Sequence, residues 1–138
     1  MPLTLNTQVA HVERSLWPTV SVNGNYNHAG VSAHSGDGLA TVVRRQSSGQ
    51  LNPEWVEILQ GLPIGWTDPD CDDLAPWPGW PAPPDIGGQY AYEPPRTVTG
   101  MKNRAARLKA LGNCVVPQQA EPMFRTIATI EQIVTTMR

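Results

Sequence analysis

The segment Leu51-Asn-Pro-Glu-Trp-Val-Glu-Ile-Leu-Gln-Gly61 decides the fold, because it combines a strong helix start with a clear helix stop. Asn52 is a residue type whose side chain accepts a hydrogen bond from an amide at a helix N-terminus, and Pro53 suits the first helical position. Gly61 ends the predicted helix. Three apolar residues fall on one side of it, with the first as the expected packing anchor: Trp55, Ile58 and Leu59.

Two more helices are predicted in the C-terminal third. One runs from Asn103 to Leu111, is capped by Asn103 and is closed by Gly112. Its expected inward residues are Ala105, Leu108 and Leu111, and its expected outward residues are Arg104, Arg107 and Lys109. The other follows Pro117, and its apolar residues recur every three or four positions: Ala120, Met123, Phe124, Ile127, Ile130, Val134 and Met137. This pattern predicts a broad apolar stripe that needs a covering surface.

The rest of the chain is expected to be mostly loop, because 14 prolines and 12 glycines exceed average usage. Leu39 to Arg45 is compatible with a short strand or a helical turn, and the remainder of residues 1–50 is interpreted as turns. The Pro-rich stretch from Thr67 to Thr97 is expected to form an extended loop. Its Trp77 and Trp80 either bind a partner's groove or, the favoured alternative, lie on the protein's own surface.

Together these patterns predict a mainly α fold with extensive irregular loops and little β structure. The 138 residues are enough for one small domain. Four segments follow one another: an irregular segment at 1–50, a helix and Gly-Pro turn at 51–67, a Pro-rich acidic loop at 68–99, and a final motif with an amphipathic helix at 100–138.

Charge is sorted along the chain, although the formal net charge is only -2. Residues 66–95 carry six acidic side chains and no basic one, whereas residues 96–138 carry seven basic side chains and two acidic ones. The C-terminal third is therefore the part whose charge is compatible with nucleic acid.

Cysteine usage and hydropathy point to a soluble, cytoplasmic protein with free thiols and no membrane partner. Cys71 and Cys114 lack a metal-type spacing such as C-x-x-C, so no metal site is expected. No apolar stretch is long enough for a signal peptide or a membrane span.

Two segments of the chain, in this order, are similar to parts of a known protein family. The first is Leu51-Asn-Pro-Glu-Trp-Val-Glu57, followed by Gly61-Leu-Pro-Ile-Gly-Trp-Thr67, and the second is Arg104-Ala-Ala-Arg-Leu-Lys-Ala-Leu-Gly-Asn-Cys-Val-Val-Pro-Gln-Gln-Ala120. They resemble the DNA cytosine-5 methyltransferases of phages and bacteria: the first is similar to the sequence after the target-recognition region of these enzymes, and the second to their final motif, Gly-Asn-x-Val-x-Pro before a terminal helix. Leu16-Trp-Pro-Thr19 is similar to a stretch that precedes the first segment, so residues 1–50 become a target-recognition-like part. These stretches occur in the same order as in the family, and the resemblance covers nearly the whole chain except the acidic loop.

The final motif also has a purely structural explanation, in which Gly112 and Asn113 stop one helix and Pro117 starts the next. The family's catalytic residues, moreover, are absent. Its reaction needs a cysteine thiolate that attacks C6 of a flipped cytosine, and this cysteine follows a proline. The chain contains no Pro-Cys pair. Cys71 lies among aspartates that disfavour a thiolate, and Cys114 occupies a variable position of the final motif.

Other catalytic signatures of the family are absent too. These are the Phe-x-Gly-x-Gly turn that receives the cofactor and the Glu-Asn-Val segment that holds the target base. Ser35-Gly-Asp-Gly38 is interpreted as a turn and not a cofactor loop, because no buried strand is expected before it and no helix after it. The resemblance therefore implies a chain that does not methylate DNA alone and lacks the family's doubly wound sheet.

The resemblance assigns roles only to matching positions. Gly112, Asn113 and Val115 are candidate contacts to S-adenosylmethionine, which would bind only with a complementing catalytic domain, and the C-terminal helix would dock on that domain. Basic residues that flank the recognition-like region are candidate contacts to DNA phosphates: Arg44, Arg45, Lys102, Arg104 and Arg107. An ordinary solvated basic face is the alternative for this set.

Three interpretations remain open at this point. The first is a C-terminal part or split subunit of a DNA cytosine-5 methyltransferase that supplies DNA recognition and closes the S-adenosylmethionine site. The second is a non-catalytic, phage-derived protein that binds DNA or a methyltransferase. The third is a gene remnant that folds poorly.

Overall fold

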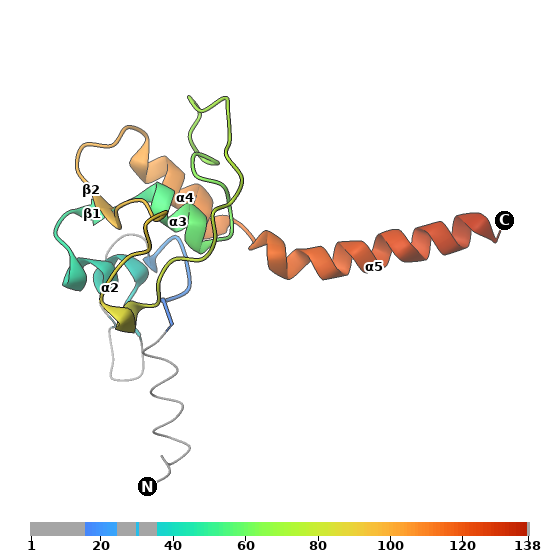
Figure 1. The fold of residues 1–138 in the computed structure, drawn as a ribbon, viewed down its shortest axis with the longest axis horizontal. Helices are drawn as coiled ribbons and strands as arrows, with labels where there is room; N and C mark the ends of the chain where they lie inside the picture. Colours follow the sequence, from blue (N-terminus) through green and yellow to red (C-terminus); the bar gives the residue numbers. More distant parts are fainter. Residues whose placement is uncertain (1–15, 25–29, 31–35, 138) are drawn as a thin grey trace, which may run out of the picture.

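The computed structural model describes residues 16–24, 30 and 36–137. Its elements are α2 (Leu39–Gln46), β1 (Gln50–Leu51), α3 (Pro53–Leu59), the 3-10 helix η2 (Pro84–Ile86), β2 (Thr97–Val98), α4 (Arg104–Asn113) and α5 (Pro117–Thr136). In the described part of the chain, helices dominate and two short strands form one small sheet, which confirms the expected mainly α fold (Figure 1). Parts of the predicted turns in residues 21–28 and 35–38 lie outside the described residues.

Helix α3 begins and ends where the local sequence predicts. The Asn52 side chain accepts a hydrogen bond from the Glu54 amide at 3.0 Å, and Pro53 stands in the first turn, where no amide donor is needed. Gly61 follows the helix with a φ of 74°, a left-handed conformation that favours glycine. Trp55 is fully buried, as expected of the packing anchor.

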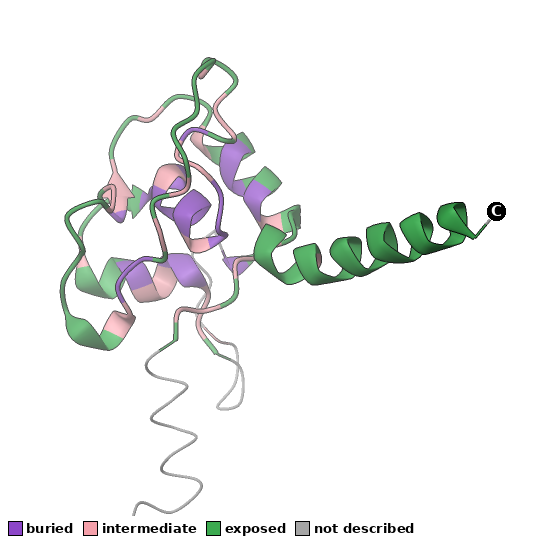
Figure 2. Ribbon diagram, turned by 45° about the vertical axis from the view of Figure 1, so that its right-hand side comes forward, coloured by how far each residue is buried: buried purple, intermediate pink, exposed green. Residues whose placement is uncertain are grey.

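One apolar core is assembled from α2, β1, α3 and α4, which together with β2 form the body of the molecule. Its largest buried side chains are Leu39, Val43, Leu51, Trp55, Val56, Ile58, Leu108 and Leu111. Helix α3 lies between α2 and α4 in both Figure 1 and Figure 2. Burying each such side chain contributes about 1.5–3 kcal/mol. Helix α3 supplies three of the eight, Trp55, Val56 and Ile58, and is therefore the central element of the body. The stretch from Leu39, for which a short strand or a helical turn was expected, is the helix α2. A helix therefore does follow Gly38, so the expectation that none follows it was wrong.

The Pro-rich loop follows α3 in the chain and leads to β2, which pairs with β1 directly before α3. Strand β2 pairs antiparallel with β1, with Thr97 opposite Leu51. Trp77 is half-buried and donates from Nε1 to the Ile58 carbonyl at 3.1 Å, and Trp80 packs edge-on against it while remaining exposed. The loop therefore packs on the protein's own surface, which was the favoured alternative for these two tryptophans.

The ends of α4 differ from the prediction. Asn103 has a φ of 56°, and its side chain makes no capping hydrogen bond. The helix continues through Gly112 to Asn113, so Gly112 does not close it. A Cβ atom on Gly112 would lie 2.3 Å from the Val22 nitrogen. Glycine is needed there because a neighbouring backbone segment packs directly against the helix.

The faces of α4 also differ from the prediction. Leu108 and Leu111 are buried as expected, but Ala105 is exposed and Arg107 is buried, which reverses the expectation for these two residues. Charge alone suggested that Arg107 would face solvent. It faces inward because the buried carboxylate of Glu57 provides a countercharge on α3.

Helix α5 projects away from the body (Figure 1). It starts at Pro117, as predicted, and Gln118 Nε2 donates to the Gly61 carbonyl at 2.9 Å, which ties its first turn to the end of α3. Every residue of α5 is exposed except the half-buried Ala120, so the helix is uniformly green in Figure 2 apart from its start. No part of the described chain covers the predicted apolar stripe.

Candidate functional site

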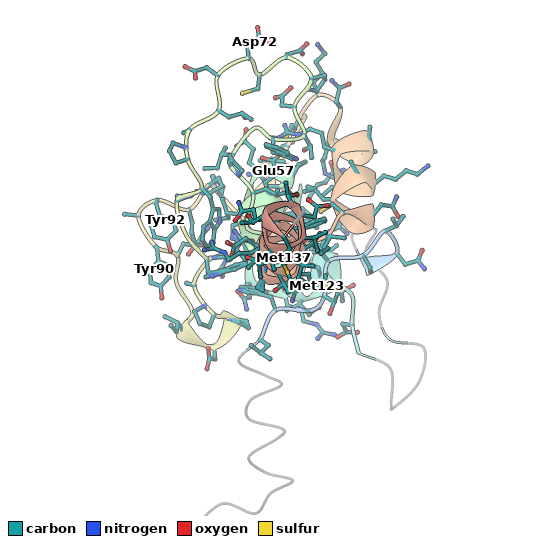
Figure 3. All side chains as sticks on the ribbon, turned by 90° about the vertical axis from the view of Figure 1, so that its right-hand side faces the viewer. Glu57, Asp72, Tyr90, Tyr92, Met123 and Met137 are labelled. Atoms are coloured by element: carbon teal, nitrogen blue, oxygen red, sulfur yellow. The ribbon has the colours of Figure 1, made fainter. Side chains whose placement is uncertain are left out.

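A buried ion pair joins the two segments that carry the family resemblance. Arg107 Nη2 lies 3.0 Å from Glu57 Oε1, and the exposed fractions of the two side chains are 3% and 0%. Figure 3, which looks along α5, labels Glu57 within the body. Removing one partner of a buried ion pair leaves an uncompensated charge and costs about 3–5 kcal/mol. The pair therefore fixes the packing of α3 on α4.

The same carboxylate organises the turn that follows α3. Glu57 Oε2 accepts a hydrogen bond from the Gly65 amide at 2.6 Å, and Oε1 accepts from the amide and hydroxyl of Thr67 at 2.9 and 2.5 Å. Arg107 Nε donates to Thr67 Oγ1 at 3.1 Å, and Nη1 lies 3.4 Å from Asp68 Oδ2. Both charges are enclosed and satisfied, so this buried junction holds structure together and does not present an acid or base to a substrate.

Arg107 is therefore not a phosphate contact, contrary to the prediction. Its guanidinium is buried and already paired with the carboxylates of Glu57 and Asp68. Arg104 is half-buried, and its Nε donates to the Leu51 carbonyl at 3.0 Å, which attaches the start of α4 to β1.

The other predicted phosphate contacts lie at the surface but on two separate elements. Arg44 and Arg45 lie in the last turn of α2, where Arg45 forms a 2.6 Å salt bridge with Asp37. Lys102 precedes α4 and pairs with Asp70 at 2.7 Å. Arg44 and Arg45 thus belong to α2 and Lys102 to the segment before α4, and α3 lies between these two helices (Figure 1).

At the C-terminal end of α4, three distant parts of the chain line an open groove of about 380 Å³. The lining residues are Trp17 to Val20, Leu59 and Gln60, Cys114 to Val116, and Gln119. Gln60 Nε2 donates to the Leu111 carbonyl at 3.0 Å, in the interior, and so fixes the end of α3 to α4. The groove is thus bounded by the Trp-Pro-Thr stretch, the end of α3 and the final motif.

The three predicted cofactor contacts have different surroundings. Val115 lines this groove and is 67% exposed. Asn113 is exposed at the last position of α4, whereas Gly112 packs against the backbone of Ser21 and Val22. Only Val115 is therefore placed to contact a molecule in the groove.

Neither cysteine is arranged as a nucleophile. Cys71 Sγ lies 3.5 Å from the Asp73 carbonyl, and Cys114 Sγ donates to the Leu111 carbonyl at 3.2 Å. Burial raises the pKa of the Cys114 thiol, which disfavours the reactive thiolate. The described residues include no group of three or more His, Cys, Asp or Glu side chains that could hold a metal ion.

A polar network under the Pro-rich loop was not predicted from the sequence. The Glu93 carboxylate accepts hydrogen bonds from Trp55 Nε1, the amides of Ala82 and Tyr90, and Gln89 Nε2. Burial alone would raise the pKa of Glu93, but these hydrogen bonds outweigh it and lower the pKa. Arg96 lies beside this network, with its guanidinium carbon 4.8 Å from the Trp17 ring centre. In the sequence, the only feature that distinguished Arg96 was its position as the first basic residue after the acidic stretch of residues 66–95.

Comparisons with protein-family models, curated proteins and solved structures gave no match. The methyltransferase resemblance thus rests on the residues of this chain alone. Among the helices of the described residues, none is long and apolar enough to cross a membrane.

Proposed function

We propose that this chain is the C-terminal part or a split subunit of a DNA cytosine-5 methyltransferase, which contributes DNA recognition and closes the S-adenosylmethionine site but is incomplete for catalysis alone. The observation that carries the proposal is the buried junction between Glu57 and Arg107. It joins the two separate segments that resemble the family, while Val115 of the final motif and the apolar residues of α5 lie at the surface.

The junction gives the resemblance a physical basis. Glu57 belongs to the first resembling segment, Gly65 and Thr67 to the turn that follows it, and Arg107 to the final segment. The buried carboxylate of Glu57 accepts hydrogen bonds from the other three. Two segments that match the family in order are thus also complementary in space, which an accidental match of two short motifs would not require.

The apolar stripe of α5 supports docking on a separate domain. Its positions are spaced alternately by three and four residues: Ala120, Met123, Ile127, Ile130, Val134 and Met137. This spacing is typical of a seam that packs against other helices. Ile127 and Ile130 are each about half-exposed. A continuous apolar face of this kind marks an interaction surface, and the proposal assigns it to a helical face of the catalytic domain.

The groove at Val115 suits a closing wall of a cofactor pocket. Valine and tryptophan side chains supply apolar surface, and Gln60 and Gln119 supply amides. The described lining residues include no carboxylate, although sites that bind a nucleoside ribose commonly provide one to its hydroxyls. The residues therefore fit one side of an S-adenosylmethionine site, with the ribose-binding and catalytic groups supplied by the complementing domain.

The experiment that tests the proposal is complementation. A cytosine-5 methyltransferase that carries the Phe-x-Gly-x-Gly and Pro-Cys segments is truncated before its region corresponding to Leu16 and mixed with this chain. Transfer of a radiolabelled methyl group from S-adenosylmethionine to unmethylated plasmid DNA is measured. We expect transfer only in the mixture. If both components are folded and the mixture stays inactive, the proposal is wrong; salt-sensitive DNA binding in that case favours the non-catalytic alternative.

A matched pair of variants tests the role of α5 in the mixture. Ile130→Glu places a carboxylate in the apolar seam and is expected to reduce methyl transfer at least about tenfold. Gln132→Glu adds the same charge on the opposite side of the helix and should leave transfer unchanged. Equal effects of both variants would contradict docking through the stripe.

A further inference from the structure

A second groove, of about 510 Å³, lies where the end of α2 meets the loop after η2. Gln46 at the end of α2 and Ser47 directly after it line one side, and Gly87, Gly88 and Gln89 line it from the loop. Among the described residues of the lining, Arg96 is the only charged one. The groove therefore differs in chemistry from the groove at Val115, whose described lining residues are all uncharged.

Arg96 is a buried cation without a salt bridge to any described carboxylate. Its exposed fraction is 6%. Nη1 donates to Gln46 Oε1 at 2.6 Å, Nη2 donates to the Gly88 carbonyl at 2.5 Å, and Nε has no hydrogen-bond partner. All its partners are neutral, so the full charge of the guanidinium is poorly compensated.

The carboxylate of Glu93 compensates the charge of Arg96 only in part. Glu93 interacts with Arg96 electrostatically, but its carboxylate oxygens already accept hydrogen bonds from Trp55 Nε1 and from backbone amides. Burial lowers the pKa of Arg96, with Glu93 acting in the opposite direction, so the site pays a desolvation cost to keep the cation. The faces of Trp17 and Trp55, 4.8 and 5.9 Å from the guanidinium carbon, supply part of the compensation.

The groove wall opposite α2 leaves the peptide backbone accessible. A Cβ atom built on Gly87 or Gly88 would meet nothing within 4 Å. Gly87 has a φ of 70°, in the left-handed region, directly after the turn of η2. Backbone turns of this kind form concave surfaces that bind anions. Ser47 adds a hydroxyl from the other side.

We infer that this groove is an anion site that binds a phosphate oxyanion next to Arg96, supplied by a DNA phosphodiester or by free phosphate. Arginine suits phosphate oxygens through its forked donors, and no carboxylate in the lining would repel the anion. Arg44 and Arg45, which directly precede Gln46, add positive charge near the same end of α2. The inference concerns this chain alone and does not depend on a complementing catalytic domain.

The test follows the Arg96 Nε–H group and the indole N–H groups of Trp17 and Trp55 by NMR in the isotope-labelled full chain. Inorganic phosphate and a short DNA duplex are titrated separately, with sodium chloride and sodium acetate at matched ionic strength as controls. A saturable shift of these signals with phosphate, with DNA or with both supports the inference, and the ligand that binds more tightly identifies the source. No saturable shift with either, or an equal shift with acetate, would overturn it.

Glycine variants keep the test independent of folding. Gly88→Asp adds a negative charge at the groove, where space is open, and is expected to weaken phosphate or DNA binding about tenfold. Gly36→Asp adds the same charge at a glycine outside this groove that is equally unobstructed, and should bind like the unchanged chain. If both variants keep their dispersed spectra and Gly88→Asp binds as tightly as Gly36→Asp, the anion site is wrongly placed.

Discussion

The body and α5 use similar apolar residues in opposite ways. In the body, Ile58 and Leu108 are completely buried, whereas Ile127 and Ile130 of α5 are 51% and 55% exposed. Both regions have helices with an apolar face. The difference is that the body supplies its own covering surfaces through α2, α3 and α4, and α5 receives none from the described chain. An apolar face thus predicts burial against something, but not that the same chain provides it.

The largest expected contrast concerns the charged pairs of the two regions. Glu57→Gln leaves Arg107 buried without its main countercharge, and we expect a loss of about 3–5 kcal/mol in the free energy of unfolding. Glu121→Gln removes the exposed partner of Arg125 on α5 and should produce no measurable change. Urea denaturation followed by tryptophan fluorescence measures both. A small effect of Glu57→Gln would mean that the junction does not hold the body together.

Shortening one apolar side chain in the body and one on α5 tests the same difference between the two regions. Ile58→Ala creates a cavity in the core, and we expect it to lower the free energy of unfolding by about 3 kcal/mol. Ile130→Ala removes the same atoms from an exposed position and should change the unfolding of the isolated chain very little. The urea midpoints of the two variants provide the measurement. Similar losses would show that α5 is covered in solution, for example by a second copy of the chain.

Gly112→Ala tests whether the final motif is packed into the body. Alanine is the better helix former by about 1 kcal/mol, so an unobstructed position would be stabilised. Here the added Cβ would meet the backbone of Ser21 and Val22, and we expect a net loss of about 1–3 kcal/mol. Thermal unfolding by circular dichroism gives the sign. Gly36→Ala, where nothing obstructs the Cβ, is the control, and stabilisation by Gly112→Ala would rule out the close contact.

The smallest expected effect is a change in how strongly the stability of the body depends on acid pH. The folded-state pKa of Glu93 lies below its ordinary value of 4.5, so its ionised form contributes stability above that pH, which is lost as the pH falls through the folded-state pKa. Urea midpoints measured from neutral pH to below pH 4 should therefore fall less steeply for Glu93→Gln than for the unchanged chain. Glu131→Gln on α5 should retain the original acid profile. Parallel profiles for all three proteins would contradict the role of Glu93.

Local signals were sufficient for most of the helices. Asn52, Pro53 and Gly61 set the bounds of α3, and Pro117 sets the start of α5, because capping and backbone conformation act over a few neighbouring residues. The spacing of apolar residues also identified the stripe of α5. The cap at Asn103 failed because that residue adopts a left-handed conformation with no capping hydrogen bond.

Part of the candidate site could be anticipated in the same way. The final motif marked Val115, which lines the groove, but the motif could not show that Gly112 contacts a segment about 90 residues earlier. The contribution of Trp17 to both the groove and the Arg96 site was likewise not visible, because these contacts join positions far apart in the chain.

By itself, then, the sequence determined that α3, α4 and α5 are helical, that the Pro-rich stretch is mostly loop and that α5 has an apolar face, since these properties depend on near neighbours. Only the tertiary structure decided that Arg107 faces inward and that Arg96 is buried over two tryptophans. A charged side chain enters the interior only where distant residues supply its countercharge, hydrogen bonds or aromatic faces, and those partners are brought together by folding.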